Sequence, residues 1–246
     1  MTKKALLFDL DGTLLPMDRE EFVRAYLPGI SAAAAAIGDP KTIARSILQA
    51  SNAMVASVDR GATLETVFWQ EFEKLSGITR QHSEALFNRY YHSEAFDLVR
   101  EVTPYEPLVP QIIDEARKTG YRLILATSPL FPRIAVEKRI FWAGLLPSDF
   151  ELITTFEHFH AAKPNIEYYT EILSMIGLDG PECIMIGNDA REDLPAPNKL
   201  GMETFLVRNH AIIPEGYSYH CDHEGDYTSL LSFIKGLKAR ESGICS

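Results

Sequence analysis

The tract from residue 5 to 15 constrains the fold of this chain more than any other segment. It reads ALLFDLDGTLL, so an apolar run ends in two aspartates two positions apart, followed by a glycine. A continuous apolar run predicts a buried strand, and a glycine directly after it predicts a turn. Side chains at positions i and i+2 of a strand point to the same face, so Asp9 and Asp11 should emerge together. Open α/β sheets bind their ligands at this carboxyl end of the strands.

The two carboxylates need a physical explanation, because a buried carboxylate is costly unless it is hydrogen-bonded, paired or bound to a metal. One alternative is a plain strand end with two solvated aspartates. We expect instead that Asp9 and Asp11 share a cation or take part in one reaction.

Composition leaves many globular folds open but limits the partners. The chain has 246 residues, 46% of them hydrophobic, and a formal net charge of −10. This length allows one or two domains. Non-specific nucleic-acid binding depends on clustered Lys and Arg, so the negative charge argues against a nucleic-acid partner. No apolar segment reaches membrane-spanning length and no signal-peptide pattern precedes the first strand, so we expect no membrane partner.

The cysteines indicate a cellular compartment. Cys183, Cys221 and Cys245 are odd in number and widely spaced, which favours a reducing compartment over a disulfide framework. We therefore expect a cytoplasmic protein. The sequence gives no indication of the oligomeric state.

Helical patterns dominate residues 18–101, and strands alternate with helices from residue 104 onward. In the first part we expect helices at 31–37, 42–58, 63–75 and 78–91. In the second part we expect strands at 121–127, 150–154, 183–187 and 204–207, and helices at 107–119, 134–143, 166–176 and 227–237. Such alternation gives right-handed crossovers and a parallel sheet covered on both faces. The sequence therefore predicts an α/β fold, a Rossmann-like doubly wound parallel sheet with a helical insertion in its first crossover.

Three further polar segments lie at the ends of the predicted strands. Thr127 and Ser128 end the second strand, Lys163 precedes a helix, and the acidic loop 187–193 follows the fourth strand. Taken singly, each segment is equally typical of a helix cap or a solvated loop. Their order behind the Asp-x-Asp-Gly-Thr-Leu tract is far more specific.

In this order the segments resemble the motifs of the haloacid dehalogenase superfamily of aspartate-nucleophile phosphatases. Motif one is residues 9–14, motif two is the Thr127 hydroxyl, motif three is Lys163 and motif four is the loop 187–193. The resemblance implies a core domain of residues 1–16 and 105–246, with residues 17–104 as a helical cap domain. It also implies a Mg²⁺-dependent phosphatase that acts on a small phosphorylated metabolite through an aspartyl-phosphate intermediate.

The resemblance gives each matched residue a role. Asp9 would be the nucleophile, and Asp11 would protonate the leaving oxygen and later accept a proton from water. Lys163 would neutralise negative charge at the nucleophile and the phosphoryl group. Thr127 and Ser128 would bind phosphoryl oxygens. The Mg²⁺ site would be rich in oxygen, with Asp11 contributing its backbone carbonyl, and would comprise Asp9, Asp11, Asp189 and Asp193.

One departure from the family pattern leaves a metal ligand open. The fourth motif commonly has Asp directly after Gly, whereas Asn188 follows Gly187 in this chain. Either Asp189 or the amide oxygen of Asn188 would take the role. We favour Asp189, because a carboxylate outcompetes a neutral amide for Mg²⁺.

Three alternatives share parts of the pattern. A dehalogenase of the superfamily would not need the second aspartate, so Asp11 argues against it. A phosphoglucomutase-like enzyme would keep both aspartates and return the phosphoryl group to a bound sugar, which depends on cap residues that the sequence does not place. A non-catalytic binding module on a degenerate phosphatase fold is disfavoured. An active site that has lost its activity has no physical need to keep Asp9, Asp11, Thr127 and Lys163.

Two local patterns are given structural interpretations. The run HCDH at 220–223 could suggest zinc, but adjacent positions cannot all face one ion without an irregular backbone. We expect an exposed polar turn there. For Arg191 and Glu192 we expect a local ion pair within the acidic loop.

Overall fold

A six-stranded parallel sheet forms the centre of the molecule. The computed structural model describes residues 3–242, so Cys245 lies outside the described residues. The strand order is β3-β2-β1-β4-β5-β6, and every pairing is parallel. The strands are β1 (Ala5–Phe8), β2 (Arg122–Leu125), β3 (Leu152–Ile153), β4 (Cys183–Gly187), β5 (Glu203–Val207) and β6 (His223–Gly225). This arrangement confirms the α/β fold that the sequence predicts.

The position of β1 in the sheet explains its apolar sequence. It lies between β2 and β4, and all four of its residues are buried. Ala5 pairs with Arg122 on one side and with Cys183 on the other. The strand order reverses between β1 and β4, which is where doubly wound sheets open a crevice at their carboxyl ends. The residue directly after β1 is Asp9, so the fold delivers this carboxylate to the crevice.

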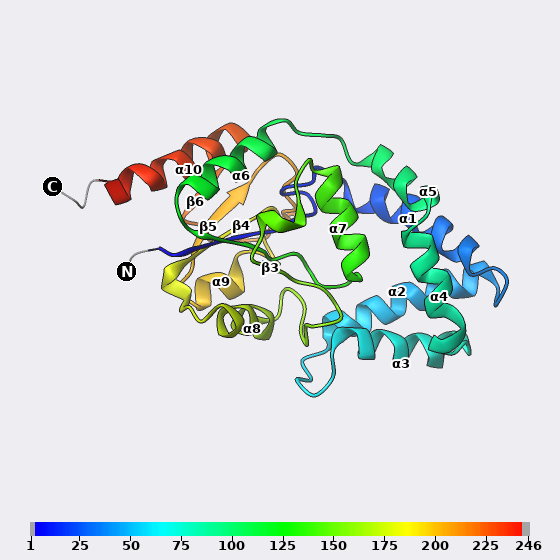
Figure 1. The fold of residues 1–246 in the computed structure, drawn as a ribbon. Coiled ribbons are helices and arrows are strands. Elements are labelled where there is room, and N and C mark those ends of the chain that lie inside the picture. Colours follow the sequence, from blue (N-terminus) through cyan, green and yellow to red (C-terminus); the bar gives the residue numbers. More distant parts are fainter. Residues whose placement is uncertain (1–2, 243–246) are drawn as a thin grey trace.

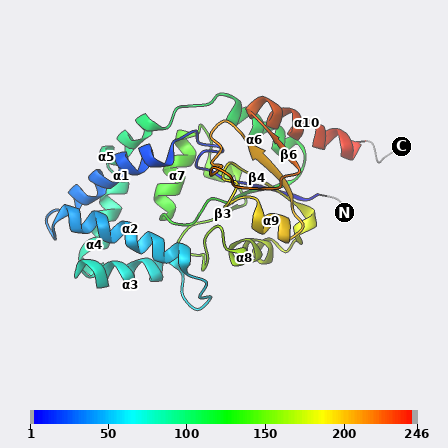
Figure 2. The same cartoon turned by 180° about the vertical axis from the view of Figure 1, so that it is seen from behind.

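Helices cover both faces of the sheet (Figures 1 and 2). Helices α6 (Leu108–Lys118) and α10 (Tyr227–Ser242) pack together on one face, and α8 (Ile166–Ile176) and α9 (Pro195–Lys199) lie on the other. Helix α7 (Arg133–Trp142) lies between the sheet and a helical layer to the right in Figure 1. No helix within residues 3–242 combines the length and the apolar character that a membrane span requires.

The helical layer is formed by the chain between β1 and α6. It contains α1 (Arg19–Ala33), α2 (Pro40–Ala56), α3 (Leu64–Ser76), α4 (Arg80–Tyr91), α5 (Glu94–Asp97) and a 3₁₀ turn over Leu98–Val102. Side chains of Asp18, Asp39 and Thr63 cap α1, α2 and α3 by accepting a backbone N–H of the first turn. The layer lies beyond the carboxyl ends of the strands, away from both chain termini (Figure 1).

Backbone hydrogen bonds connect this layer to the sheet. The first-turn amides of Leu64 and Glu65 donate to the carbonyls of Phe159 and Phe156 at 2.8 and 2.9 Å. Free amides at a helix N-terminus need such partners, so α3 is fixed against the segment that follows β3. The Asn165 side chain adds a bond from Nδ2 to the carbonyl of Val55 at 2.8 Å.

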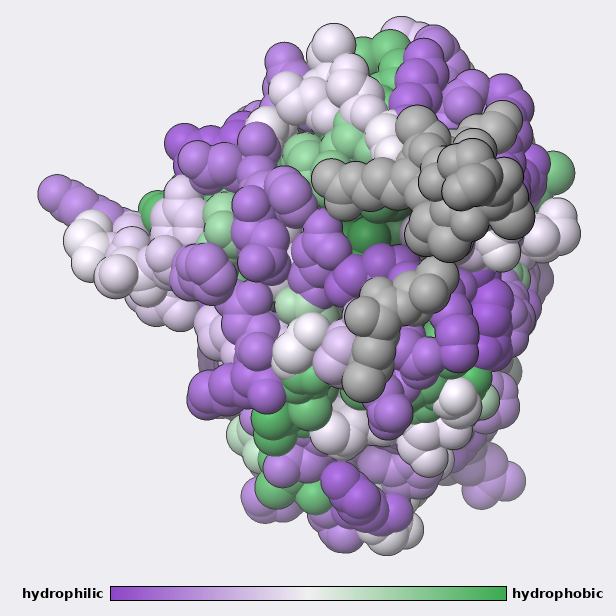
Figure 3. All heavy atoms as spheres, turned by 90° about the vertical axis from the view of Figure 1, so that its left-hand side faces the viewer, coloured by the Kyte–Doolittle hydropathy of each residue, from purple (hydrophilic) through white to green (hydrophobic). Residues whose placement is uncertain are grey.

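Two expectations about local structure are wrong. The alanine-rich segment 31–37 is helical only to Ala33, and residues 34–37 form turns before Asp39 and Pro40 start the next helix. Residues 220–223 are not simply an exposed turn, because His223 begins β6 and its Nε2 lies 2.8 Å from Glu203 Oε1. The face shown in Figure 3, which is the left-hand side of Figure 1, is largely hydrophilic.

Candidate active site

A tight turn after β1 positions the first motif. Gly12 adopts φ +87°, and its amide donates to the carbonyl of Leu15 at 2.7 Å. A Cβ at position 12 would lie 2.2 Å from Nδ2 of Asn188, so both the conformation and the space require glycine. Thr13 then donates from Oγ1 to Asp9 Oδ2 at 3.0 Å. The turn therefore brings motif one against motif four.

Asp9 is part of a buried group of three charged side chains. Lys163 Nζ lies 2.7 Å from Asp9 Oδ1 and 2.7 Å from Asp193 Oδ1. Burial raises the pKa of Asp9 to about 7, although Lys163 acts in the opposite direction. Burial disfavours the charged form of Lys163, but Asp193 and Asp9 outweigh it and hold the pKa of this ammonium well above its usual value. The Lys163 ammonium thus pairs with two carboxyl groups. A further cation beside Asp9 would favour the ionised form of the Asp9 carboxyl group.

Asp193 organises the acidic loop. Its Oδ2 accepts the backbone amides of Asn188 and Asp189 at 3.0 and 2.9 Å, while its Oδ1 faces Lys163. A Cβ on Gly187 would lie 2.2 Å from Asp193 Oδ2, so the end of β4 needs a glycine for this close approach. Both oxygens of Asp193 are therefore engaged by groups of the protein.

Asn188 and Asp189 differ in how their side chains are used. Asn188 donates from Nδ2 to the carbonyl of His210 at 2.7 Å and accepts from Thr13 Oγ1 at 3.1 Å. Asp189 accepts a backbone amide on Oδ1, but its buried Oδ2 has no hydrogen-bond partner and lies 3.6 Å from an Arg191 nitrogen. A buried carboxylate oxygen without a hydrogen bond is costly, which makes Asp189 the better candidate for holding a cation.

The carboxylates of Asp9, Asp11, Asp189 and Asp193 do not converge on one position that a metal ion could occupy. Within residues 3–242, no group of three or more His, Cys, Asp or Glu side chains is arranged to hold a metal ion. Lys163 lies between Asp9 and Asp193, and the Asp11 carboxylate turns toward Arg139. The donors are nevertheless the hard oxygens that Mg²⁺ prefers, and the unpartnered Oδ2 of Asp189 fits such an ion. The ligand set of Asp9, Asp11, Asp189 and Asp193 stays a prediction.

Arg139 is a site residue that the sequence analysis missed. It comes from α7, is completely buried, and binds Asp11 Oδ2 through Nη1. Its Nε donates to the carbonyl of Ala135 at 3.2 Å, and its guanidinium carbon lies 4.4 Å from the ring centroid of Phe131 and 5.8 Å from that of Phe22. The sequence pattern that could have indicated a buried Arg139 is its place on the same helical face as the other buried residues of α7. Arg139 anchors one oxygen of Asp11, while Oδ1 has no hydrogen-bond partner.

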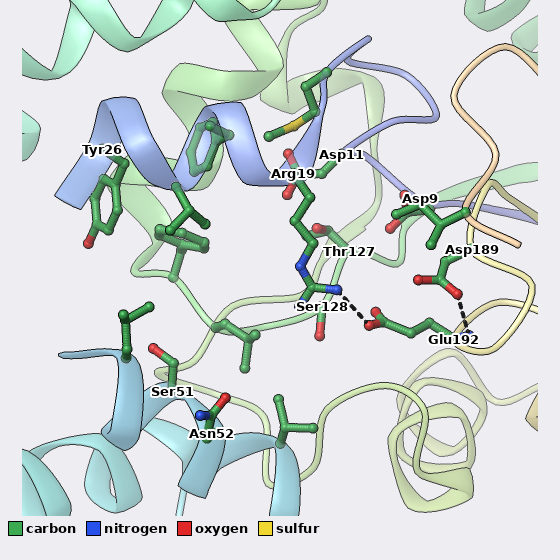
Figure 4. A pocket seen from close by; sticks show the side chains of 18 of the residues that line it. Asp9, Asp11, Arg19, Tyr26, Ser51, Asn52, Thr127, Ser128, Asp189 and Glu192 are labelled. Atoms are coloured by element: carbon green, nitrogen blue, oxygen red, sulfur yellow. Dashed lines mark hydrogen bonds and ion pairs between the residues drawn. The ribbon is translucent and has the colours of Figure 1, made fainter. Parts of the chain in front are cut away.

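A cavity of about 300 Å³ joins these groups (Figure 4). Asp9, Asp11, Thr127, Ser128 and Asp189 line it, as the sequence analysis expects of site residues. Asp193 lines it too, whereas Lys163 is buried behind Asp9 and is not part of the wall. The carbonyl of Thr127 accepts the Tyr168 hydroxyl at 2.8 Å, which fixes the backbone just after β2, and Thr127 lines the cavity.

The expected local ion pair within the acidic loop is present for Arg191, which pairs with Asp189 at 3.6 Å, but not for Glu192. Glu192 pairs instead with Arg19 of α1, with Nη1 and Oε1 3.1 Å apart, and Arg191 lies near Asp189. Tyr169 of α8 donates its hydroxyl to the carbonyl of Glu192 at 2.9 Å. The acidic loop is thus held from two sides, by α8 and by the helical layer.

The family assignment now follows from the comparison with known sequences. The family model described as haloacid dehalogenase-like hydrolase matches residues 3–201. The chain belongs to this hydrolase family. In this haloacid dehalogenase-like hydrolase, the ends of the sheet strands bring Asp9, Thr127 and Asp189 to one cavity.

Similar proteins support the same assignment. The pyrophosphatase PpaX of Bacillus velezensis is 27% identical over 240 residues, which cover 95% of this chain and 97% of the relative. The solved HAD phosphatase of Thermococcus onnurineus shares 21% identity with a TM-score of 0.59, covering 95% of this chain and 98% of that one. The HAD-hydrolase YfnB of Bacillus subtilis, solved with bound magnesium, shares 17% identity with a TM-score of 0.55, covering 95% and 99%. The two structures confirm the fold.

Proposed function

We propose that this haloacid dehalogenase-like hydrolase is a Mg²⁺-dependent phosphatase that hydrolyses a small phosphorylated metabolite. The observation that carries the proposal is the buried Asp9–Lys163–Asp193 group, whose nucleophile candidate opens on a cavity lined also by Asp11 and Thr127. An attacking carboxylate, a candidate acid–base and a hydroxyl donor thus meet in one place.

Electrostatic repulsion explains the need for a cation. Two unit charges 4 Å apart repel by about 1 kcal/mol in water, and by more in a drier site. Bound Mg²⁺ would offset the charge between the carboxylate and the phosphoryl group and orient the two. Asp9, Asp189, Asp193 and the backbone carbonyl of Asp11 would hold it, and Asp193 also keeps Lys163 and the acidic loop in place.

The chemistry would proceed in two displacements at phosphorus. Asp9 attacks, the bond to the leaving oxygen breaks, and Asp11 gives that oxygen a proton. Water then attacks the aspartyl-phosphate, Asp11 accepts its proton, and inorganic phosphate leaves. Because Arg139 anchors Oδ2 of Asp11, Oδ1 is the oxygen available to carry the proton. The Thr127 and Ser128 hydroxyls donate to phosphoryl oxygens.

We propose further that residues 17–104 are a cap domain over a core of residues 1–16 and 105–246. Side chains from α1 and α2 form one wall of the cavity and core residues form the other. The Arg19–Glu192 pair and the Asn165–Val55 bond connect the two sides. A cap in this position would exclude water from the intermediate and contact the leaving group. The three cysteines of the sequence support a cytoplasmic location for such an enzyme.

Phosphate release from p-nitrophenyl phosphate, with and without Mg²⁺, tests the proposal. We expect turnover with Mg²⁺ and its loss when the metal is chelated. If the wild type released no phosphate with any divalent metal, the phosphatase proposal would fail and a binding module would be favoured.

Substitutions in the acidic loop separate the two candidate ligands. Asp189→Asn should raise the Mg²⁺ concentration for half-maximal activity by more than about tenfold, because a carboxylate ligand is lost. Asn188→Ala removes bonds to Thr13 and His210 instead, so it should lower thermal stability without a comparable shift in metal requirement. Metal titrations of both variants, with melting curves alongside, check this. The opposite order of metal requirements would assign the role to Asn188.

A further inference from the structure

The cavity wall opposite the carboxylates is apolar. It is formed by side chains of α1, α2 and the segment after β2, namely Val23, Leu27, Ile47, Leu48, Val55 and Leu130. Leu48 keeps 43% of its surface exposed although it lies on this wall. An apolar wall facing the reacting groups is suited to an apolar ligand, because covering it removes hydrocarbon from water.

The charges of the cavity disfavour a second anionic group on the substrate. Besides Asp9 and Asp11, the lining includes the carboxylates Asp189, Glu192 and Asp193. Among its described lining residues, the cation is Arg19, which is already paired with Glu192 at 3.1 Å. A pyrophosphate or a carboxylated ester would therefore bring a second negative charge into an acidic cavity whose lining cation, Arg19, is already paired.

The polar groups of the apolar wall are few. Ser51 and Asn52 of α2 lie there (Figure 4), and Ser51 donates its hydroxyl to the carbonyl of Ile47 at 2.9 Å. The hydroxyl of Tyr26 is bonded to that of Tyr91 at 2.7 Å. Asn52 is left as the side chain best able to meet one polar group. A sugar would bring several hydroxyls into this space and leave most of them without partners, which is costly.

We propose that the leaving group of the substrate is an uncharged and largely apolar alcohol or phenol, with at most one polar group near Asn52. This rests on the proposed phosphatase function. It makes Leu48 and its neighbours the specificity-determining surface, and it separates this chain from an enzyme that acts on pyrophosphate or on a sugar phosphate.

A series of n-alkyl phosphates from ethyl to hexyl tests the inference, because the leaving-group chemistry is nearly constant along it. We expect kcat/KM to rise about threefold to fourfold per added methylene until the cavity is filled. Hexyl phosphate should exceed pyrophosphate and glucose 6-phosphate by at least about tenfold. A flat series, or a preference for either polar substrate, would overturn the inference.

Two matched variants locate the effect. Leu48→Asn should reduce the gain per methylene about twofold. Leu146→Asn changes a leucine that is 53% exposed and lies outside the cavity lining, so it should keep the wild-type series. Equal effects of the two variants would contradict a role for Leu48.

Alkylphosphonates distinguish failure of this inference from failure of the phosphatase proposal, because they bind without being hydrolysed. Calorimetry in the presence of Mg²⁺ should show tighter binding of hexylphosphonate than of methylphosphonate. Such a preference without hydrolysis of any ester would support the apolar site and overturn the phosphatase. Equal binding of the two phosphonates would overturn the inference itself.

Discussion

Asp9→Asn should lower phosphate release by about 10⁴-fold or more, because an amide cannot form the aspartyl-phosphate. The fold should tolerate the change. Burial already raises the pKa of Asp9 to about 7, so a neutral group of the same shape suits this position. Lys163 would keep its contact with Asp193. The measurement is kcat for p-nitrophenyl phosphate at saturating Mg²⁺.

The matched control is Asp114→Asn, which changes an exposed aspartate of α6 and should leave kcat unchanged. Mass spectrometry of the Asp9→Asn protein guards against deamidation, which would restore the aspartate. Rapid acid quench should trap phosphoryl label on the wild type and none on the variant. Activity within tenfold of the wild type in a verified variant would remove Asp9 as the nucleophile.

Elements with a strong pattern of their own could be predicted from the sequence. The apolar run of β4 and the helical spacing of α8 predict the first and last residues of both elements correctly. These segments pack against the core along their whole length. The prediction of a helix over the alanine-rich segment 31–37 was wrong, because high helix propensity does not decide where a chain must turn. Strand β6 was missed because its three residues, His223, Glu224 and Gly225, carry no apolar signal and form a strand only by pairing with β5.

The site could be predicted only in part, for a similar reason. The motif spacing brings Asp9, Thr127 and Asp189 to one cavity, as expected. The partners of each charge depend on residues far away in the sequence. Arg139 looks like an ordinary helical arginine until the fold sets it against Asp11, 128 positions earlier. The pairing of Glu192 with Arg19 spans 173 positions and was equally hidden.

Asp11→Ala should lower the free energy of unfolding by about 3 kcal/mol, because it leaves the buried Arg139 guanidinium without its carboxylate. Breaking a buried pair costs about 3–5 kcal/mol, and the lower end applies because the Asp11 side chain is 30% exposed. Urea unfolding measures the change. Glu71→Ala, which breaks a pair with a Lys74 that is 71% exposed, is the control and should cost less than about 1 kcal/mol.

Adding Arg139→Met to Asp11→Ala should restore much of the lost stability. The methionine would carry no charge and would pack against Phe22 and Phe131, which now face the guanidinium. Arg139→Met alone leaves the half-buried Asp11 carboxylate unpaired, so it should be less stable than the double variant. If Asp11→Ala were as stable as Glu71→Ala, the Arg139 charge would be satisfied by other groups and would not depend on Asp11. A double variant no more stable than Asp11→Ala would show that Arg139 stabilises the fold through its packing. The charge of Arg139 would then not explain why Asp11 is held at the edge of the cavity.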